Sequence, residues 1–176
     1  MHKRIKNILS FHCPAWDELP EKPMFNQEVV DYVQSVLDPL MEGKVALTPT
    51  MIQNYSKWGA IPKIPGRKYG KEQIAILLTI AIYKQVLPID QVREGVELQV
   101  KNVSIDKSFD IFSETMNTAI QRIFKNAGQK LYELESVKFL PNTEGIQAVS
   151  YAFAAKLLAT LIIDLGGYKK LGEKHE

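Results

Sequence analysis

The sequence predicts an all-α protein that is mainly helical with one short wing, and two observations lead to this fold class. Apolar residues recur at three- and four-residue spacing along most of the chain, whereas the strict alternation typical of strands is almost absent. Prolines and glycines lie at the ends of the periodic segments, where they end helices. The chain has 176 residues, of which 45% are hydrophobic and 24% charged, so it can form a globular protein with a substantial core.

The first segment predicts an arm and an amphipathic helix. Residues 1–26 contain three prolines, which indicates an irregular arm, and Trp16 is expected to anchor it against the body. Apolar residues then recur at helical spacing over 27–40. Asn26 is a suitable N-cap, and Gly43 marks the end of this helix.

A short helix and a loop come next. Thr48 can accept hydrogen bonds from the free N–H groups of a helix, and Pro49 suits its first turn. We therefore expect a helix over 48–58 that ends at Gly59. Residues 61–69 contain two prolines and a glycine, which exclude a helix and favour a short extended loop or a hairpin wing.

The rest of the chain predicts five further helices. They begin at Lys71, at Pro88, near Phe109, at Gln129 and at Glu144. Residues 99–107 are expected to form a connector, and the fourth of these helices is expected to end at Phe139. The last helix runs to Leu165 and is closed by two glycines. It is apolar nearly all round, so we expect it to be buried on every side.

The last helix also raises the question of a membrane. A spanning helix needs about 20 mostly apolar residues, but Lys156 lies within this segment, and a central lysine costs roughly 2.5–3.5 kcal/mol on insertion scales. We expect a helix of a soluble protein without membrane contact. No signal-peptide pattern is visible, and the single cysteine, Cys13, cannot form an intramolecular disulfide. These observations predict a cytoplasmic protein.

Charge is distributed unevenly along the chain. The net charge is only +2, which excludes a coat of positive charge. Residues 44–84, however, carry seven basic residues and a single acid, Glu72, or +6, whereas the rest has 15 basic and 19 acidic residues, or −4. A basic field over a short helix and an irregular loop attracts phosphate groups. The alternative is a solvated charged face, but interleaved amide and aromatic side chains favour a nucleic-acid surface.

Several residues between Leu47 and Val92 form a recognisable pattern. A short helix ends in tyrosine, a Gly-Ala-Ile turn and a basic Gly-Arg-Lys-Tyr stretch follow, and a helix containing Ile and Leu leads to a last short helix. The residues are Tyr55, Gly59, Arg67, Tyr69, Ile74, Leu77 and Ile89–Val92. This segment resembles the DNA-binding domain of the MerR family of bacterial transcription regulators. The whole chain, with its Trp16–Pro20 motif, looks closer still to an uncharacterised bacterial family of unknown function that carries the same segment.

Three features depart from the MerR pattern. Gln53 and Asn54 stand where the family usually has Arg-Tyr, and Val86 stands in place of the usual glycine. The link from the helix over 27–40 is also longer. These differences bear on the docking of the helix pair and on the readout of bases.

The resemblance implies two domains and a function. Residues 27–100 would form a MerR-like winged helix-turn-helix, and residues 103–168 a C-terminal helical bundle for dimerisation or sensing. The chain would be a bacterial DNA-binding transcription regulator, a homodimer on two-fold sites. It would bind double-stranded DNA through the recognition helix 48–58 and the basic wing 61–69. A small-molecule effector of the C-terminal helices is left open.

Nine side chains of this segment are candidate DNA contacts. They are Thr48, Thr50, Gln53, Asn54, Lys57, Lys63, Arg67, Lys68 and Lys71. Threonines at a helix N-terminus can bind phosphate, amides can read adenine, and basic side chains of a wing can contact the DNA backbone. Tyr55 and Trp58 are expected in the core instead. The function requires Thr50, Asn54, Arg67 and Lys68 to be exposed on one face.

Two other functions stay open. The first is a helical protein-interaction module whose MerR-like segment no longer binds DNA, an alternative that the Gln53 and Asn54 differences sustain. The second is small-ligand sensing in an apolar pocket. Its candidate lining residues are Phe109, Phe112, Phe124 and Phe153.

The sequence does not predict an enzyme, and no catalytic residue, cofactor or metal is expected. The nearest candidate for a metal site is the group of His2, His12 and Cys13, which lacks a Cys-x-x-Cys pair. Glu133 and Glu135 fall on different helical faces and form no carboxylate pair. Neither a glycine-rich phosphate loop nor a nucleophile–histidine spacing occurs in the sequence.

Overall fold

The computed structural model describes residues 1–128 and 137–172, and within them the fold is all-helical, as predicted. The α-helices are α1 (Lys3–Leu9), α2 (Asn26–Met41), α3 (Pro49–Lys57), α4 (Lys71–Tyr83), α5 (Ile89–Asn102), α6 (Ile105–Phe124) and α7 (Glu144–Asp164). Two short 3-10 turns, Trp16–Glu18 and Tyr168–Leu171, complete the elements. No strand forms in the described residues, where an isolated antiparallel bridge joins Met24 and Tyr69.

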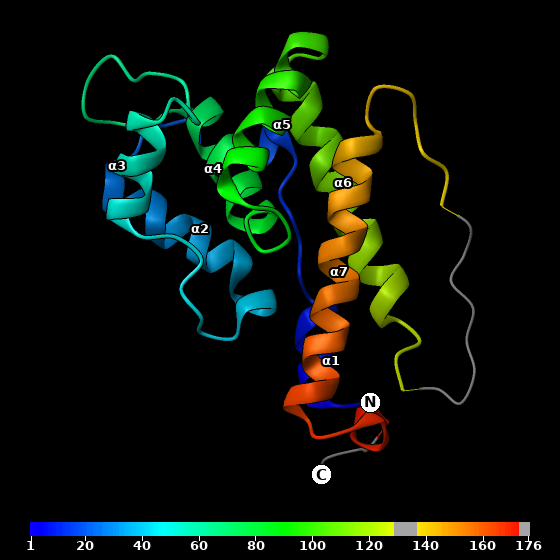
Figure 1. Ribbon diagram of the computed structural model, residues 1–176. Coiled ribbons are helices and arrows are strands. Elements are labelled where there is room, and N and C mark those ends of the chain that lie inside the picture. Colours follow the sequence, from blue (N-terminus) through cyan, green and yellow to red (C-terminus); the bar gives the residue numbers. More distant parts are fainter. Residues whose placement is uncertain (129–136, 173–176) are drawn as a thin grey trace.

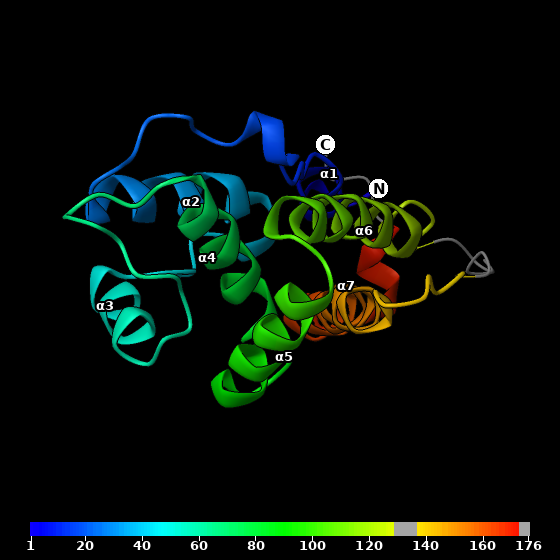
Figure 2. The same ribbon diagram turned by 90° about the horizontal axis from the view of Figure 1, so that it is seen from above.

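The helices form two groups joined through α4. On one side α6 and α7 pack along each other and α1 lies against α6, while α2 and α3 form the opposite side (Figure 1 and Figure 2). α4 contacts α2, α5, α6 and α7 and buries ten of its thirteen residues, so it is the central helix of the core. This arrangement holds α3 at an edge of the molecule, away from α6 and α7.

The first 26 residues are more ordered than the irregular arm that the sequence predicts. Ile5 and Ile8 are buried one turn apart, and His2 caps the helix by accepting a backbone N–H at 3.1 Å, so α1 forms. The prediction was wrong here because two apolar residues are too few to show a helical period. The rest of the arm is non-helical apart from one 3-10 turn. Trp16 anchors it as expected, with its ring centroid 6.4 Å from that of Phe109.

Two helix boundaries differ from the prediction. α5 continues to Asn102 and α6 begins at Ile105, so the connector expected over 99–107 shrinks to the two residues between these helices. It does so because no proline or glycine interrupts this stretch. The N-cap of α2 is Phe25 rather than Asn26, which already belongs to the helix.

One predicted helix falls mainly on residues that the structure does not describe. It was expected over 129–139, and its described end, 137–139, is not helical. Glu133 and Glu135 also lie outside the described residues.

α7 ends as predicted, but it is not buried on every side. It is followed by Gly166 with φ of 71° and Gly167 with φ of 135°, backbone conformations that favour glycine. Its inner face packs against α4 and α6, whereas its outer face is exposed. The exposed apolar residues are Ala148, Ala152, Ala155, Ala159 and Ile163. The prediction was wrong because an alanine-rich helix is apolar all round even when only one side of it is packed.

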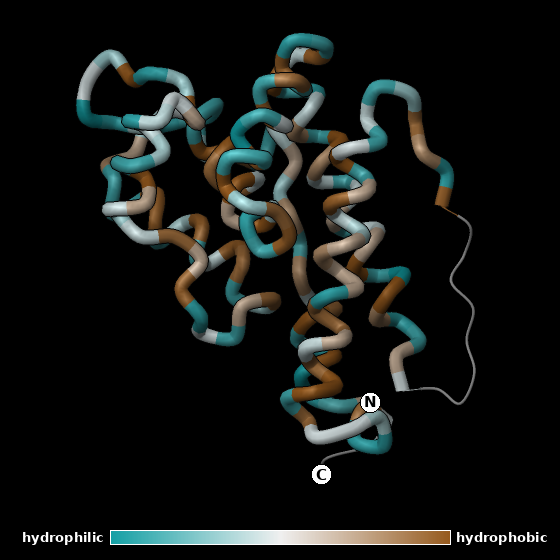
Figure 3. Tube along the Cα trace, viewed as in Figure 1, coloured by the Kyte–Doolittle hydropathy of each residue, from teal (hydrophilic) through white to brown (hydrophobic). Residues whose placement is uncertain are grey.

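The length and hydropathy of α7 also bear on the membrane question. Among the described helices it is the one long and apolar enough, by length and composition, to cross a membrane, and 33% of its most apolar window is buried. Figure 3 shows it in tan and brown along most of its length. The core helix of a soluble protein meets the same criterion.

Candidate nucleic-acid interface

α3 is a short helix whose start and inner face are well fixed. Thr48 caps it as predicted, because its Oγ1 accepts the Met51 N–H at 3.1 Å, and Pro49 is the first helical residue. Ile52 and Tyr55 lie on the inner face and are buried. The cap and the buried pair together set which side of α3 faces outward.

The outward face of α3 carries three of the candidate DNA contacts. Thr50, Gln53 and Lys57 lie three and four residues apart, so they share one side of the helix, and all three are exposed. α3 itself lies at the edge of the molecule (Figure 1). These side chains therefore point away from the core.

Asn54 lies at the border of this face. It is only partly exposed and lines a hollow together with Trp58 and Lys84. Lys84 is the C-cap of α4. Its Nζ is 3.4 Å from Met51 Sδ, and burial lowers its pKa. Asn54 is therefore less accessible than the other candidates of α3.

The link between α2 and α3 is fixed by a side chain that gives no sequence signal. The Gln34 amide accepts the Ala46 N–H at 3.0 Å and donates to Lys44 O at 3.1 Å. Asn26 Nδ2 donates to Pro49 O at 3.3 Å. These bonds hold the start of α3 against α2, although the link is longer than the three or four residues of a usual helix-turn-helix.

The loop of residues 58–70 stands where the wing was predicted. It is an extended loop and not a hairpin. Its Tyr69 exchanges both backbone hydrogen bonds with Met24 of the arm, at 2.8 and 2.9 Å. A hairpin is disfavoured because Pro62 and Pro65 cannot donate the N–H bonds of paired strands. The exposed cations of the loop are Lys63, Arg67 and Lys68.

The arm contacts two of the candidate lysines. Lys68 Nζ lies 4.6 Å from the centre of the Phe25 ring, a cation–π contact, and the side chain stays exposed. Lys71 forms an ion pair with Glu21 and lies 5.5 Å from the centre of the Trp16 ring, so that only 17% of its side chain is exposed. Lys71 therefore helps to pack the arm, and its charge is offset by a carboxylate.

Tyr55 lies in the core, as predicted, but Trp58 does not. Trp58 is 51% exposed, and its ring centroid is 6.1 Å from that of Tyr55. Gly59, with φ of 68°, turns the chain back so that the Ala60 N–H donates to Tyr55 O at 2.8 Å. This turn leaves the indole outside. Arg93 Nη1 of α5 donates to Trp58 O at 3.5 Å, so a hydrogen bond links α5 to the end of α3.

Six of the nine candidates are exposed on α3 and the loop that follows it, which lie next to each other at one end of the molecule (Figure 1 and Figure 2), and we call these six residues the basic edge. Its residues are Thr50, Gln53 and Lys57 of α3 and Lys63, Arg67 and Lys68 of the loop. Of the other three, Thr48 uses its hydroxyl as a cap, Asn54 is partly buried, and Lys71 is paired with the arm. No acidic residue occurs between Lys44 and Lys71, so the basic edge attracts anions without a competing carboxylate from its own segment.

The residues considered for metal or thiol chemistry serve the arm. His12 Nε2 is 3.0 Å from Glu18 Oε2. Burial raises the pKa of the Cys13 thiol to about 12, and Asn117 holds the Cys13 backbone by accepting its N–H at 2.8 Å and donating to its C=O at 3.0 Å. In the described residues no three His, Cys, Asp or Glu side chains gather as metal ligands would.

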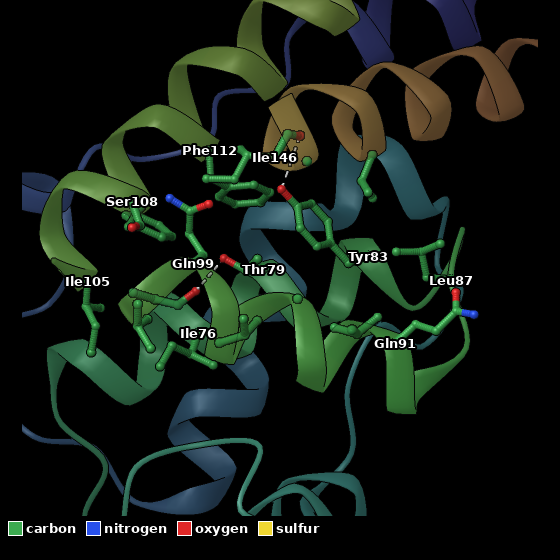
Figure 4. A pocket seen from close by; sticks show the side chains of 18 residues that line it. Ile76, Thr79, Tyr83, Leu87, Gln91, Gln99, Ile105, Ser108, Phe112 and Ile146 are labelled. Carbon is green, nitrogen blue, oxygen red and sulfur yellow. Dashed lines mark hydrogen bonds between the residues drawn. The ribbon is translucent and has the colours of Figure 1, made fainter. Parts of the chain in front are cut away.

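The four aromatic residues suggested for a ligand pocket do not share one. Phe109 and Phe112 line a cavity between α4, α5, α6 and the start of α7 (Figure 4). Phe124 is fully buried at the other end of α6, and Phe153 lines a different hollow beside α1 and α2. The prediction was wrong for Phe124 because it lies twelve residues, or about 18 Å, along α6 from Phe112. It was wrong for Phe153 because the cavity is lined by the start of α7, and Phe153 lies further along that helix.

The fold and this site define an all-helical protein with one basic edge formed by a capped short helix and a proline-containing loop. Residues 14–122 match a family described as a domain of unknown function (DUF1836). The chain belongs to this family. The matched segment includes the basic edge and ends inside α6. No curated protein and no solved structure matches the chain.

Proposed function

We propose that the protein is a cytoplasmic DNA-binding transcription regulator. Its MerR-like winged helix-turn-helix would consist of α2, α3, the loop 58–70 and α4, with α3 as the recognition helix. The observation that carries the proposal is the basic edge, where six candidate contacts are exposed together in a segment with a single acid. The resemblance to MerR regulators supports the same assignment.

The shape of α3 suits the major groove of duplex DNA. The groove is about 12 Å wide and an α-helix with its side chains about 10–12 Å. Thr50 lies in the first turn, where free N–H groups favour a phosphate oxygen. Gln53, one turn further, can form a bidentate pair with adenine. Lys57 at the end of α3 can reach the next phosphate.

The loop would contact the DNA backbone beside the recognition helix. Lys63, Arg67 and Lys68 are exposed on it, and the bridge between Tyr69 and Met24 holds its end in place. Backbone contacts of this kind fix the position and orientation of a protein on DNA without reading sequence. Lys71, which is paired with Glu21, is not among the contacts that we propose.

We also propose that the protein acts as a homodimer through α7. Two-fold DNA sites are read by two-fold protein dimers. The outer face of α7 offers small apolar residues at helical spacing, which allow two helices to approach closely. α7 lies on the opposite side of the molecule from α3 (Figure 2), so dimerisation there leaves the basic edge accessible.

The exposed indole of Trp58 favours a second candidate, a protein-interaction module. Tryptophan is enriched among the residues that contribute most to protein–protein binding. In that case Trp58→Ala should abolish capture of a protein partner, while duplex DNA should bind no better than to an unrelated protein of equal charge.

The test of the proposal is binding of labelled genomic DNA fragments, measured by fluorescence anisotropy. The double variant Arg67→Glu with Lys68→Glu should weaken binding by more than about tenfold, because two phosphate contacts become repulsive. The matched control is Lys169→Glu with Lys170→Glu, which changes the net charge equally at two exposed lysines outside the basic edge. Equal loss in both variants would mean that only net charge matters and would refute the site.

A further inference from the structure

A cavity of about 200 Å³ lies between α4, α5, α6 and the start of α7, outside the basic edge (Figure 4). Its walls are mainly aliphatic and aromatic, with Ile76 of α4, Val96 of α5 and Phe112 of α6 among them. Gly95 and Gly145 also border it, and both are exposed. A volume of about 200 Å³ is enough to hold more than a water molecule.

Among the described residues, no charged side chain lines this cavity, and most of the polar groups that do are already paired. Tyr83 Oη donates to Ile146 O at 3.3 Å, and Thr79 Oγ1 donates to a backbone carbonyl of α4 at 3.1 Å. Ser108 Oγ likewise donates to a backbone carbonyl at 3.3 Å. These groups are not available as strong donors to a ligand.

Two glutamines of α5 complete the polar lining, of which Gln91 is exposed and Gln99 is not. The Nε2 of Gln99 is buried and has no hydrogen-bond partner among the described residues. Figure 4 shows its side chain directed between Ser108 and Phe112. A buried amide donor without an acceptor is costly to a fold, and an acceptor supplied by a ligand would remove that cost.

We propose that this cavity binds an uncharged, mostly apolar small molecule of roughly nine heavy atoms, which places one hydrogen-bond acceptor on Gln99 Nε2. The size follows because a dry apolar cavity of about 150 Å³ holds benzene, and this cavity is somewhat larger. The ligand is uncharged because a buried carboxylate or ammonium group would lack a counter-charge in these walls.

A ligand in the cavity would stabilise the position of α5. This helix has a single buried residue, Val92, so it is weakly held until the space beneath it is filled. Arg93 of α5 contacts Trp58 O at the end of α3. If the protein binds DNA as proposed, the ligand would therefore change DNA affinity; the binding site itself does not depend on DNA binding.

Three probes of similar size test the site by isothermal titration calorimetry. Acetophenone combines an aromatic ring with a neutral acceptor, cumene lacks the acceptor, and benzoate is charged. We expect acetophenone to bind about two- to tenfold more tightly than cumene, the factor that one hydrogen bond supplies, and benzoate to bind most weakly. Failure of both neutral probes to bind, or tighter binding of benzoate, would overturn the proposal.

Two variants locate the binding. Gln99→Met should bring acetophenone down to the affinity of cumene, whereas the control Glu97→Met, at an exposed position of the same helix outside the cavity lining, should keep the difference. Gly95→Leu, which improves helix propensity and places a side chain where space is open, should abolish binding of both neutral probes while raising the thermal midpoint. An acetophenone preference that persists in Gln99→Met would refute the assigned donor. Probe binding without any change in DNA affinity would refute only the regulatory link.

Discussion

Two threonines two residues apart at the start of α3 have different roles. Thr48 lies before the helix and its Oγ1 accepts a backbone N–H, so its role is to stabilise α3. Thr50 lies within the first turn and is exposed, so its hydroxyl is available to DNA. One threonine thus contributes to folding, and the other is available for the proposed DNA binding.

These roles predict opposite effects for two identical substitutions. Thr48→Ala should lower the free energy of unfolding by about 0.5–2 kcal/mol, the usual cost of losing an N-cap. Thr50→Ala should leave stability within about 0.5 kcal/mol and weaken DNA binding instead. Chemical denaturation and anisotropy on both variants check this. A stability loss of similar size in Thr50→Ala would contradict the assignment.

At the scale of elements, the arm is attached to α6 through polar bonds. Asn117 pairs with both backbone groups of Cys13, and Ser113 Oγ donates to the same carbonyl at 2.8 Å. Asp110 accepts the Trp16 N–H at 2.7 Å. The arm also holds the end of the loop 58–70, because Met24 pairs with Tyr69. The attachment of the arm to α6 therefore helps to position the loop residues of the basic edge.

Removal of Asn117 should therefore loosen the arm. Asn117→Ala leaves the Cys13 N–H without its acceptor, and an unpaired buried group costs about 1–3 kcal/mol. The control is Glu114→Ala, at an exposed position of the same helix, which should change stability little. Hydrogen exchange of arm amides is the local readout, and unchanged protection of residues 11–16 would contradict this role.

The helices that the sequence predicts correctly are those with chemical signals at their ends. Thr48-Pro49 marks the start of α3, and Gly166-Gly167 marks the end of α7. α1 was missed because a two-residue apolar pattern has no visible period. The start of α6 was placed too late because the stretch before it contains no residue that breaks a helix.

The sequence was sufficient to locate the segment that carries the candidate site. It was not sufficient to show which side chains of that segment are free to bind. Helical spacing on α3 places Thr50, Gln53 and Lys57 together without further information. The pairing of Lys71 with Glu21 joins residues 50 positions apart, and no local pattern reveals it. Gln99 gave no signal either, because an unpaired donor is visible only once three helices surround it.

At the scale of the molecule, the basic edge and the outer face of α7 lie on different sides of the structure. The basic segment forms the edge with α3, and α7 exposes small apolar residues on the other side. The first surface suits a polyanion and the second suits another apolar helix. A dimer through α7 would carry two basic edges, which suits a two-fold DNA site.

The proposed dimer predicts a specific sensitivity of α7. Ala155→Glu places a charge in the middle of the exposed stripe, and burial of an unpaired charge between two helices is strongly unfavourable. We expect the variant to run as a monomer in size-exclusion chromatography with light scattering, where the wild type runs as a dimer. Leu98→Glu, at an exposed apolar position of α5, should stay dimeric. A monomeric wild type would refute this interface.

The salt dependence of DNA binding tests the central claim most directly. Each neutralised phosphate contributes about −0.9 to the slope of log K against log salt, so Lys57, Lys63, Arg67 and Lys68 predict a slope of about −3.6 per bound protomer. The Arg67→Glu, Lys68→Glu variant should show about half that slope or less, and the Lys169→Glu, Lys170→Glu control should keep it. A wild-type slope near zero, or the same slope in the wild type and the basic-edge variant, would contradict a DNA interface at this edge.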